Sequence, residues 1–189
     1  DKFPSLEIDL CHRIDKSTSG CLLLSKNKKF LRHFHNELQN NRVIKLYEAI
    51  LLGVLKKDMI VESNINLSTK EHHHKVQESS DGKKAVSKFK ILKIYNSFTH
   101  AEILISTGRM HQIRVQSANL NHPILNDKKY GLFSLNKYIA KETSISRLAL
   151  HARSISFNDL GGNNVSYEAP KNNEFDIRLS KLDNLTVKS

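Results

Sequence analysis

Apolar residues recur at two spacings along most of the chain, and each spacing predicts a type of secondary structure. Alternation of apolar and polar residues predicts strands over residues 43–53, 85–95, 98–106, 147–157 and 165–169. Helical spacing predicts a helix over residues 27–41 with Asn27 as its N-cap, a second helix after Gly108, and a terminal helix over residues 174–182. The second and third strands read as a hairpin that turns at Asn96 and Ser97.

Other segments depart from this regular pattern. Residues 56–84 are polar and poorly periodic, so we expect an exposed connection there, and residues 132–146 read as a basic, weakly patterned insertion. Residues 1–10 predict a lead-in strand or coil, and the apolar run at residues 21–24 predicts a short buried strand. No internal repeat or low-complexity linker divides the chain, so we expect a single domain over residues 1–189.

Charge is the informative part of the composition. The chain has 30 Lys and Arg residues against 19 Asp and Glu residues, which gives a formal net charge of +11 and a pI near 9.7. A hydrophobic content of 39% and a charged content of 26% are typical of a globular domain. A strongly basic globular domain indicates a polyanionic partner, nucleic acid first, although the paired lysines along the chain would also suit solvated faces.

Several classes of protein are disfavoured. No run approaches the roughly 20 apolar residues of a membrane span, and the first residues lack a signal-peptide pattern. Cys11 and Cys21 are therefore expected to be reduced thiols of a cytoplasmic protein, which we take to be a monomer. The histidine run at residues 72–74 lacks the spacing of metal ligands, so we expect no metal site.

One loop places a carboxylate among cations. His12, Arg13 and Lys16 surround Asp15, and a small-residue turn and an apolar run follow. Neighbouring cations favour an ionised, oriented carboxylate, which suits a nucleophile or a base better than a proton donor. The alternative is an ordinary surface ion pair between Arg13 and Asp15.

These residues and three later motifs resemble the RluA/RluC-type pseudouridine synthases. The first match is His-Arg-Ile-Asp at residues 12–15 followed by Thr-Ser-Gly at residues 18–20, with Ile14 where the family usually has leucine. Lys-Leu-Tyr-Glu-Ala at residues 45–49 is similar to the second motif, and Gly-Arg-Met-His-Gln-Ile-Arg at residues 108–114 is similar to the third. The turn at residues 122–131 and Leu-His-Ala at residues 150–152 continue the resemblance.

The resemblance implies roles for individual residues. It implies Asp15 as the catalytic aspartate, with Tyr47 against the target base and Arg114 as the ion-pair partner of Asp15. The residues expected to contact RNA are Arg13, Arg109, His111 and His151. We expect Arg109 and His111 in the first turn of the helix after Gly108, where free N–H groups attract phosphate, and Arg114 more than a turn inside it. His151 is equally interpretable as a structural strand residue, and no cofactor or metal is implied.

The resemblance also implies the fold and the activity. The expected fold class is α+β, with a mixed, mostly antiparallel sheet and flanking helices around a basic cleft. The expected activity is isomerisation of uridine to pseudouridine, with large-subunit ribosomal RNA as the substrate. The alternative is a non-catalytic RNA-binding module in ribosome assembly, which would not need a carboxylate in a basic cleft. The family's upstream Lys-Pro-x-Gly strand motif and S4-like domain have no match in the chain, so we expect a trimmed catalytic domain.

Overall fold

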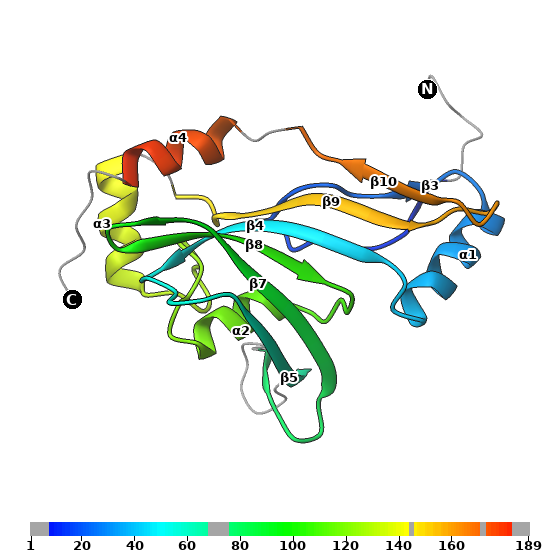
Figure 1. The fold of residues 1–189 in the computed structure, drawn as a ribbon, viewed down its shortest axis with the longest axis horizontal. Coiled ribbons are helices and arrows are strands. Elements are labelled where there is room, and N and C mark those ends of the chain that lie inside the picture. The colour runs from blue at the N-terminus through cyan, green and yellow to red at the C-terminus, as the bar shows by residue number, and fades with distance from the viewer. Residues whose placement is uncertain (1–7, 68–75, 144–145, 171–172, 183–189) are drawn as a thin grey trace.

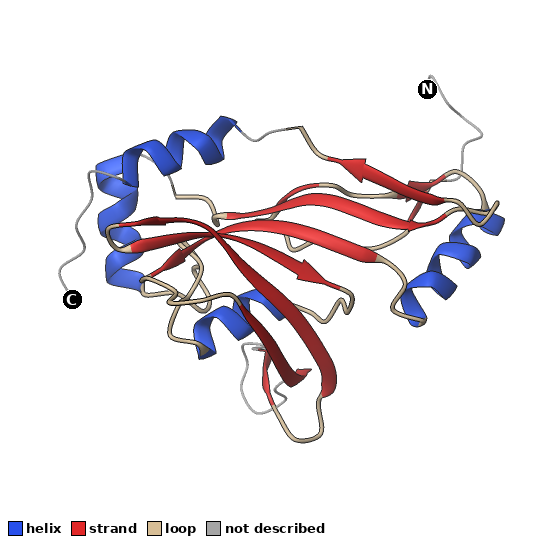
Figure 2. Cartoon of the chain, in the orientation of Figure 1, coloured by secondary structure: helices blue, strands red, loops and turns tan. Residues whose placement is uncertain are grey.

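The computed structural model describes residues 8–67, 76–143, 146–170 and 173–182 (Figure 1). They form ten strands and four helices (Figure 2). The strands are β1 (Asp9–Leu10), β2 (Ser19–Gly20), β3 (Leu24–Ser25), β4 (Ile44–Leu52), β5 (Met59–Leu67), β6 (Val76–Glu78), β7 (Lys83–Tyr95), β8 (Phe98–Ile105), β9 (Leu150–Asn158) and β10 (Asn164–Glu168). The helices are α1 (Lys28–Gln39), α2 (Gln112–Asn119), α3 (Phe133–Thr143) and α4 (Asn173–Leu182). Eight of the strands build one large sheet that the helices flank, and β1 and β3 pair in a separate two-stranded sheet.

The large sheet has eight strands, and β4 is an interior strand that pairs with β9 and β8. Seven of them follow the order β10-β9-β4-β8-β7-β5-β6 with antiparallel pairing throughout, while the short strand β2 pairs with β9 in parallel. The expected mixed, mostly antiparallel sheet and the α+β class are therefore confirmed. β4 and β9 run side by side across the molecule, whereas β5 and β7 reach away from them beside α2 (Figure 1).

Burial along β4 alternates as its sequence predicts. Lys45, Tyr47, Ala49 and Leu51 are all buried and share one face of β4. On β8, the expected inward residues Ala101, Ile103 and Ile105 are at most 4% exposed. Burial of their apolar side chains stabilises the fold, since about 25 cal/mol is gained for each Å² of apolar surface removed from water.

Helix α1 begins and packs as its sequence predicts. The Asn27 side chain accepts a hydrogen bond from the Phe30 N–H at 2.7 Å, which satisfies one of the free donors at the helix start. Phe34 is fully buried and meets Phe157 of β9 edge to face, with ring centroids 5.0 Å apart. The helix is thereby fixed against the sheet, and its C-terminal end lies beside the pocket described below.

The expectation of an exposed connection over residues 56–84 needs correction, because much of this segment belongs to the sheet. Residues 59–67 form β5, residues 76–78 form β6, and β7 begins at Lys83. β5 pairs with β7 over seven residue pairs, from Met59 with Phe89 to Ile65 with Lys83. The apolar pattern is weak here because one side of β5 stays exposed, so backbone pairing with β7 decides the conformation. The histidine run at residues 72–74 lies outside the described residues.

Two further expectations need correction. The segment over residues 132–146 contains α3, in which Leu135 and the 1% exposed Ile139 pack on the core one turn apart. The apolar run at residues 21–24 is not a buried strand, because Leu22 and Leu24 are 44% and 47% exposed, the two-residue strand β2 ends before the run and β3 begins only at its last residue. The run therefore lies partly on the surface, with Cys21 and Leu23 packed against the core and Leu22 and Leu24 exposed.

None of the helices in the described ranges is long and apolar enough to cross a membrane. Cys11 is buried, Cys21 is partly buried, and both are free thiols as expected.

Candidate active site

The loop that carries Asp15 is closed by two hydrogen bonds between residues 11–12 and Leu23. The Cys11 N–H donates to the Leu23 carbonyl at 3.1 Å, and the Leu23 N–H donates to Nε2 of His12 at 3.1 Å. Within the loop, the Thr18 N–H donates to the carbonyl of Asp15 at 2.9 Å and closes a tight turn. The carboxylate is therefore presented by a short, fixed loop.

The far end of this loop lies directly against β9. Gly20 has φ +108° and runs so close to the sheet that a Cβ at this position would lie 2.0 Å from the carbonyl oxygen of Ala152. Only glycine fits such an approach. The Cys21 N–H then donates to the same carbonyl at 2.9 Å, and the Ser19 hydroxyl lies 2.9 Å from Nδ1 of His151.

The segment over residues 108–114 faces the Asp15 loop, and its geometry differs from the expected helix start. α2 begins at Gln112, after His111 in the left-handed region at φ 54°, so Arg109 and His111 precede the helix rather than forming its first turn. Arg114 is the third helical residue rather than a residue more than a turn inside. A non-glycine residue at positive φ costs free energy, and such residues concentrate at functional sites.

Arg114 bridges two carboxylates. Its Nη1 donates to Asp15 Oδ2 at 3.0 Å, so the expected ion pair is present. Its Nε and Nη2 donate to the two oxygens of Asp127 at 2.8 and 2.9 Å. Two parallel bonds fix the plane of the guanidinium, which leaves Nη1 aimed at Asp15.

Burial and charge act in opposite directions on this pair. Burial lowers the pKa of Arg114, but its bonds to Asp127 and Asp15 raise that pKa above the usual range. Burial raises the pKa of Asp127, but Arg114 and two main-chain N–H donors lower it by more than that, so the net shift is downward. Both groups are therefore charged at neutral pH.

His111 approaches the same oxygen of Asp15 that Arg114 contacts. Its Nε2 is 3.9 Å from Asp15 Oδ2, and its Nδ1 is 2.8 Å from the hydroxyl of Tyr130. Burial lowers the pKa of His111 despite the charge of Asp15. A neutral imidazole oriented by Tyr130 therefore stands beside the carboxylate.

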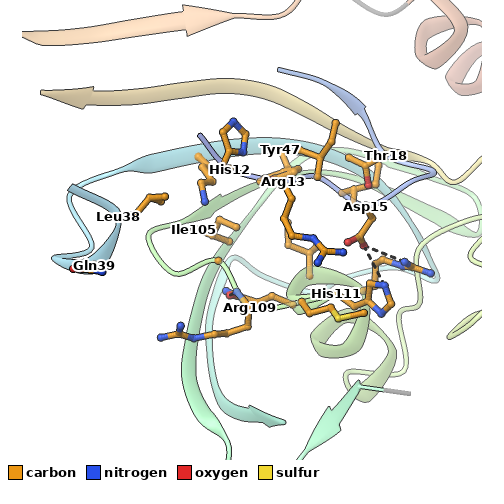
Figure 3. A pocket seen from close by; sticks show the side chains of 18 residues that line it. His12, Arg13, Asp15, Thr18, Leu38, Gln39, Tyr47, Ile105, Arg109 and His111 are labelled. Carbon is orange, nitrogen blue, oxygen red and sulfur yellow. Dashed lines mark hydrogen bonds and ion pairs between the residues drawn. The ribbon is translucent and has the colours of Figure 1, made fainter. Parts of the chain in front are cut away.

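Tyr47 forms part of the same site from β4. Its side chain is 8% exposed, and burial, followed by the charge of Asp15, raises its pKa to about 12. Its hydroxyl is therefore protonated at every pH at which the protein is expected to work. Figure 3 shows Tyr47 and Asp15 on the same side of the pocket, with Arg109 and His111 across from them.

These elements enclose a cavity of about 370 Å³. Its walls are the loop over residues 12–18, the end of α1, β4, the end of β8 and the segment over residues 108–114. Among the described residues, four cations line it, namely Arg13, Lys45, Arg109 and Arg114, whereas Asp15 is the one carboxylate. Such a volume suits a small ligand or a single nucleotide. The described part of the chain holds no cluster of His, Cys, Asp and Glu side chains that would bind a metal ion.

The residues expected to contact RNA differ in how accessible they are. Arg13 is exposed at the pocket, and Arg109 lines it while its Nε donates to the Lys84 carbonyl at 3.0 Å. His151 is 5% exposed and bonded to Ser19, so its ring is not available at the surface. The structural interpretation of His151 is therefore the one that fits.

The sequence analysis assigned no role to two residues of the site, Asp127 and Tyr130. Asp127 was noted only within a matched turn, yet it is the buried carboxylate that orients Arg114. Tyr130 orients His111, and the Arg114 guanidinium lies over its ring, with Cζ of Arg114 5.2 Å from the centroid of the Tyr130 ring. An acidic residue followed by Tyr-Gly after a helix is the signal that would have found them.

Comparison with known proteins agrees with this geometry. The sequence pattern of the family described as RNA pseudouridylate synthase matches residues 3–119. The ribosomal large subunit pseudouridine synthase C of Buchnera aphidicola subsp. Baizongia pistaciae is 38% identical over 152 residues, which cover 79% of this chain and 48% of that protein. The protein of the same name from Vibrio parahaemolyticus is 36% identical over 150 residues, covering 79% of this chain and 47% of that protein.

Solved structures show the same likeness. Human RNA pseudouridylate synthase domain containing 4 superposes with a TM-score of 0.74 at 26% identity, covering 93% of this chain and 76% of that one. Human RNA pseudouridylate synthase domain containing 1 gives a TM-score of 0.75 at 25% identity over 90% of this chain and 71% of that one. The chain spans about half the length of the curated relatives described above.

Proposed function

Because the chain belongs to the RNA pseudouridylate synthase family, we propose that it isomerises specific uridines to pseudouridine in RNA. The observation that carries the proposal is the Asp15 carboxylate, which lines a cationic pocket and is bonded to an arginine that a buried carboxylate orients. The names of the relatives specify the large ribosomal subunit, so we propose large-subunit ribosomal RNA as the substrate. A net charge of +11 fits this partner.

The reaction rearranges one nucleotide without a co-reactant. The bond between uracil N1 and ribose C1′ breaks, the uracil rotates, and a bond forms between C5 and C1′. The C5 proton is lost and N1 gains a proton, so atoms and electrons balance. Asp15, attacking either the sugar or the base ring, would divide this change into two steps through a covalent adduct.

The target base must leave the stacked RNA to reach Asp15. Extruding a base costs a few kcal/mol, which contacts inside the pocket must offset. Tyr47 lies close enough to Asp15 for its pKa to respond to that charge, which supports a role in stacking on the extruded base. Because the Tyr47 phenol is protonated, it is suited to packing and to donating a hydrogen bond.

The cations of the pocket have two roles in this proposal. Arg114 holds the Asp15 carboxylate in one direction, since its other donors are occupied by Asp127. Arg13 and Arg109, at the pocket and not engaged by a carboxylate in the described residues, would contact RNA phosphates and position the strand.

The oligomeric state and the cellular compartment belong to the same proposal. We propose that the working unit is a monomer. Two free cysteines support a reducing compartment, and we propose the cytoplasm. Light scattering of the purified protein, with and without RNA, tests the first statement.

The test is to map pseudouridines in large-subunit ribosomal RNA from cells with and without the gene, and to restore the gene as the parental sequence or as Asp15→Asn. We expect at least one site to disappear without the gene, to return with the parent, and to remain absent with Asp15→Asn. The variant is expected to fold and bind RNA. A site that returns with Asp15→Asn would remove the catalytic role, and an unchanged map would favour a non-catalytic RNA-binding module.

A further inference from the structure

A lysine is buried in the middle of the sheet beside the pocket. Lys45 is 7% exposed, and it shares the inward face of β4 with Tyr47 two residues further on. Its neighbours across the two flanking strands are Ile105 on β8 and Ile155 on β9. Lysine is almost never buried among apolar residues unless its charge is paired.

The Lys45 ammonium has no such partner in the part of the chain that the structure describes. It makes no hydrogen bond or ion pair there, and burial is the one cause that changes its pKa, lowering it to about 8. The nearby carboxylate, Asp15, is already bonded to Arg114. At neutral pH most of the Lys45 side chains are therefore charged, desolvated and uncompensated, which is costly in the free protein.

The end of the side chain opens on the pocket. A Cβ on Gly108 would lie 3.0 Å from Nζ, so glycine at this position keeps the ammonium uncovered. The charge of Lys45 lowers the pKa of His12, which places it close to the Asp15 loop as well. Nζ therefore lies between the two segments that form opposite walls of the pocket.

The position of Lys45 along β4 indicates which part of a bound nucleotide lies near its ammonium. Residues that share one face of a strand are about 6.5–7 Å apart, so Lys45 follows Tyr47 along the pocket at that spacing. A nucleotide whose base lies against Tyr47 has its own phosphate at a similar distance from the base. A phosphodiester is the anion that every RNA brings, and it would supply the missing counter-charge.

Resting on the proposed function, we infer that the Lys45 ammonium binds a phosphate oxygen of the extruded nucleotide itself. Arg13 and Arg109 can meet RNA at the surface, whereas Lys45 is reached only after the nucleotide has entered the pocket. The contact therefore stabilises the extruded state in particular. A uracil carbonyl is the competing ligand, but it is neutral and offsets less of the buried charge.

The test is a cycle between the lysine and the phosphate charge. Lys45→Met keeps the length of the side chain and removes the ammonium, so it is expected to fold with an unfolding midpoint at or above that of the parent. The RNA is a stem–loop that the protein binds, with one uridine in its loop. It is made with natural phosphates or with one uncharged methylphosphonate on the 5′ or the 3′ side of that uridine. Affinity and pseudouridine formation are measured separately on each pair.

We expect one of the two methylphosphonates to weaken binding to the parent, and to slow its turnover, by about 10- to 100-fold beyond the effect of the other. In Lys45→Met the same methylphosphonate should have no further effect, since both changes remove one contact. Lys90→Met is the matched control. Lys90 is exposed on the face of β7 opposite to the buried Phe89, and its loss removes the same charge. That control should respond to the methylphosphonates as the parent does.

Losses that multiply at both phosphates would overturn the inference, because Lys45 would then act independently of them. Coupling of Lys45→Met to 4-thiouridine or 2-thiouridine instead would assign the ammonium to a uracil carbonyl and overturn it as well. The affinity measurements decide the matter even if no pseudouridine forms. Absence of turnover in the parent would count against the proposed function alone.

Discussion

Asp127 holds the guanidinium of Arg114 in a two-point pair, Nε to Oδ2 at 2.8 Å and Nη2 to Oδ1 at 2.9 Å. The Asp127 side chain is fully buried, and it also accepts main-chain N–H bonds from Lys129 and Tyr130. Its direction is therefore set by the turn that carries it. This pair gives Arg114 a single orientation, in which the third donor points at Asp15.

The first prediction concerns this orienting carboxylate. Asp127→Asn keeps the shape but removes the charge and one acceptor, so Arg114 loses its fixed plane. We expect turnover to fall by about 10- to 100-fold, because a positioning contact of this kind is worth roughly 1.5–3 kcal/mol, while RNA affinity changes little. Breaking one side of a buried pair also destabilises the fold, by up to about 3–5 kcal/mol. Single-turnover rates at saturating RNA and urea unfolding measure the two effects, and an unchanged rate would contradict the orienting role.

The second prediction separates Arg109 from Arg114. Arg109→Ala should weaken RNA binding and reduce the slope of log affinity against log salt by about one unit, because a phosphate contact is lost. Arg114→Lys keeps the charge but loses the planar fork that joins Asp15 to Asp127, so it should bind RNA nearly normally and react far more slowly. Salt titrations beside single-turnover rates test both variants. Parental turnover in Arg114→Lys would show that the planar fork is dispensable.

The third prediction uses the protonation of Tyr47. The pKa of Tyr47 is raised to about 12, so its hydroxyl does not ionise near pH 10. The pH profile of turnover near pH 10 should therefore have the same shape in the parent and in Tyr47→Phe. If the ring stacks on the base, Tyr47→Phe should retain most of the RNA affinity, and Tyr47→Ala should lose about 1–3 kcal/mol. Equal affinities for the Phe and Ala variants would argue against stacking. A Phe variant that binds but does not react would assign the hydroxyl a part in proton transfer.

The fourth prediction concerns stability in acid. Burial, and then the charge of Lys45, lowers the pKa of His12 from 6.5 to about 4. The unfolded chain therefore binds a proton between pH 6.5 and pH 4 that the folded chain does not, so stability is fully present above pH 6.5 and falls as the pH drops through this window. The contribution is about 2 kcal/mol after allowance for partial exposure of the ring.

The matched variant is His12→Gln, whose side-chain oxygen can accept the hydrogen bond that Leu23 donates to the imidazole. Urea unfolding at pH 7 and at pH 4.5 should show a smaller acid-induced loss in His12→Gln than in the parent. The carboxylates that also titrate in this range are common to both proteins and cancel in the difference. Equal losses would mean that His12 becomes protonated in the folded state without penalty.

Local pattern was sufficient for the elements that bury one regular face. α1 was predicted from its cap and its apolar spacing, and β4 and β8 from alternation, because in each case the residues that face the core repeat with the period of the element. β5 and α3 were missed for the converse reason. β5 is defined by its hydrogen bonds to β7, and α3 by a short apolar contact with the core, and neither leaves a strong period in the sequence.

By itself, the sequence determined the family, the candidate residues Asp15, Tyr47 and Arg114, and the positive charge that indicates RNA, since these depend on residue types and their spacing. Only the tertiary structure decided how they combine. Asp15 and Arg114 are 99 positions apart, and the distance and angle of their bond depend on how two separate loops are anchored. Burial is likewise a property of the whole fold. It keeps His151 away from the surface and, among the residues that the structure describes, it leaves the charge of Lys45 without a counter-ion at the edge of the pocket.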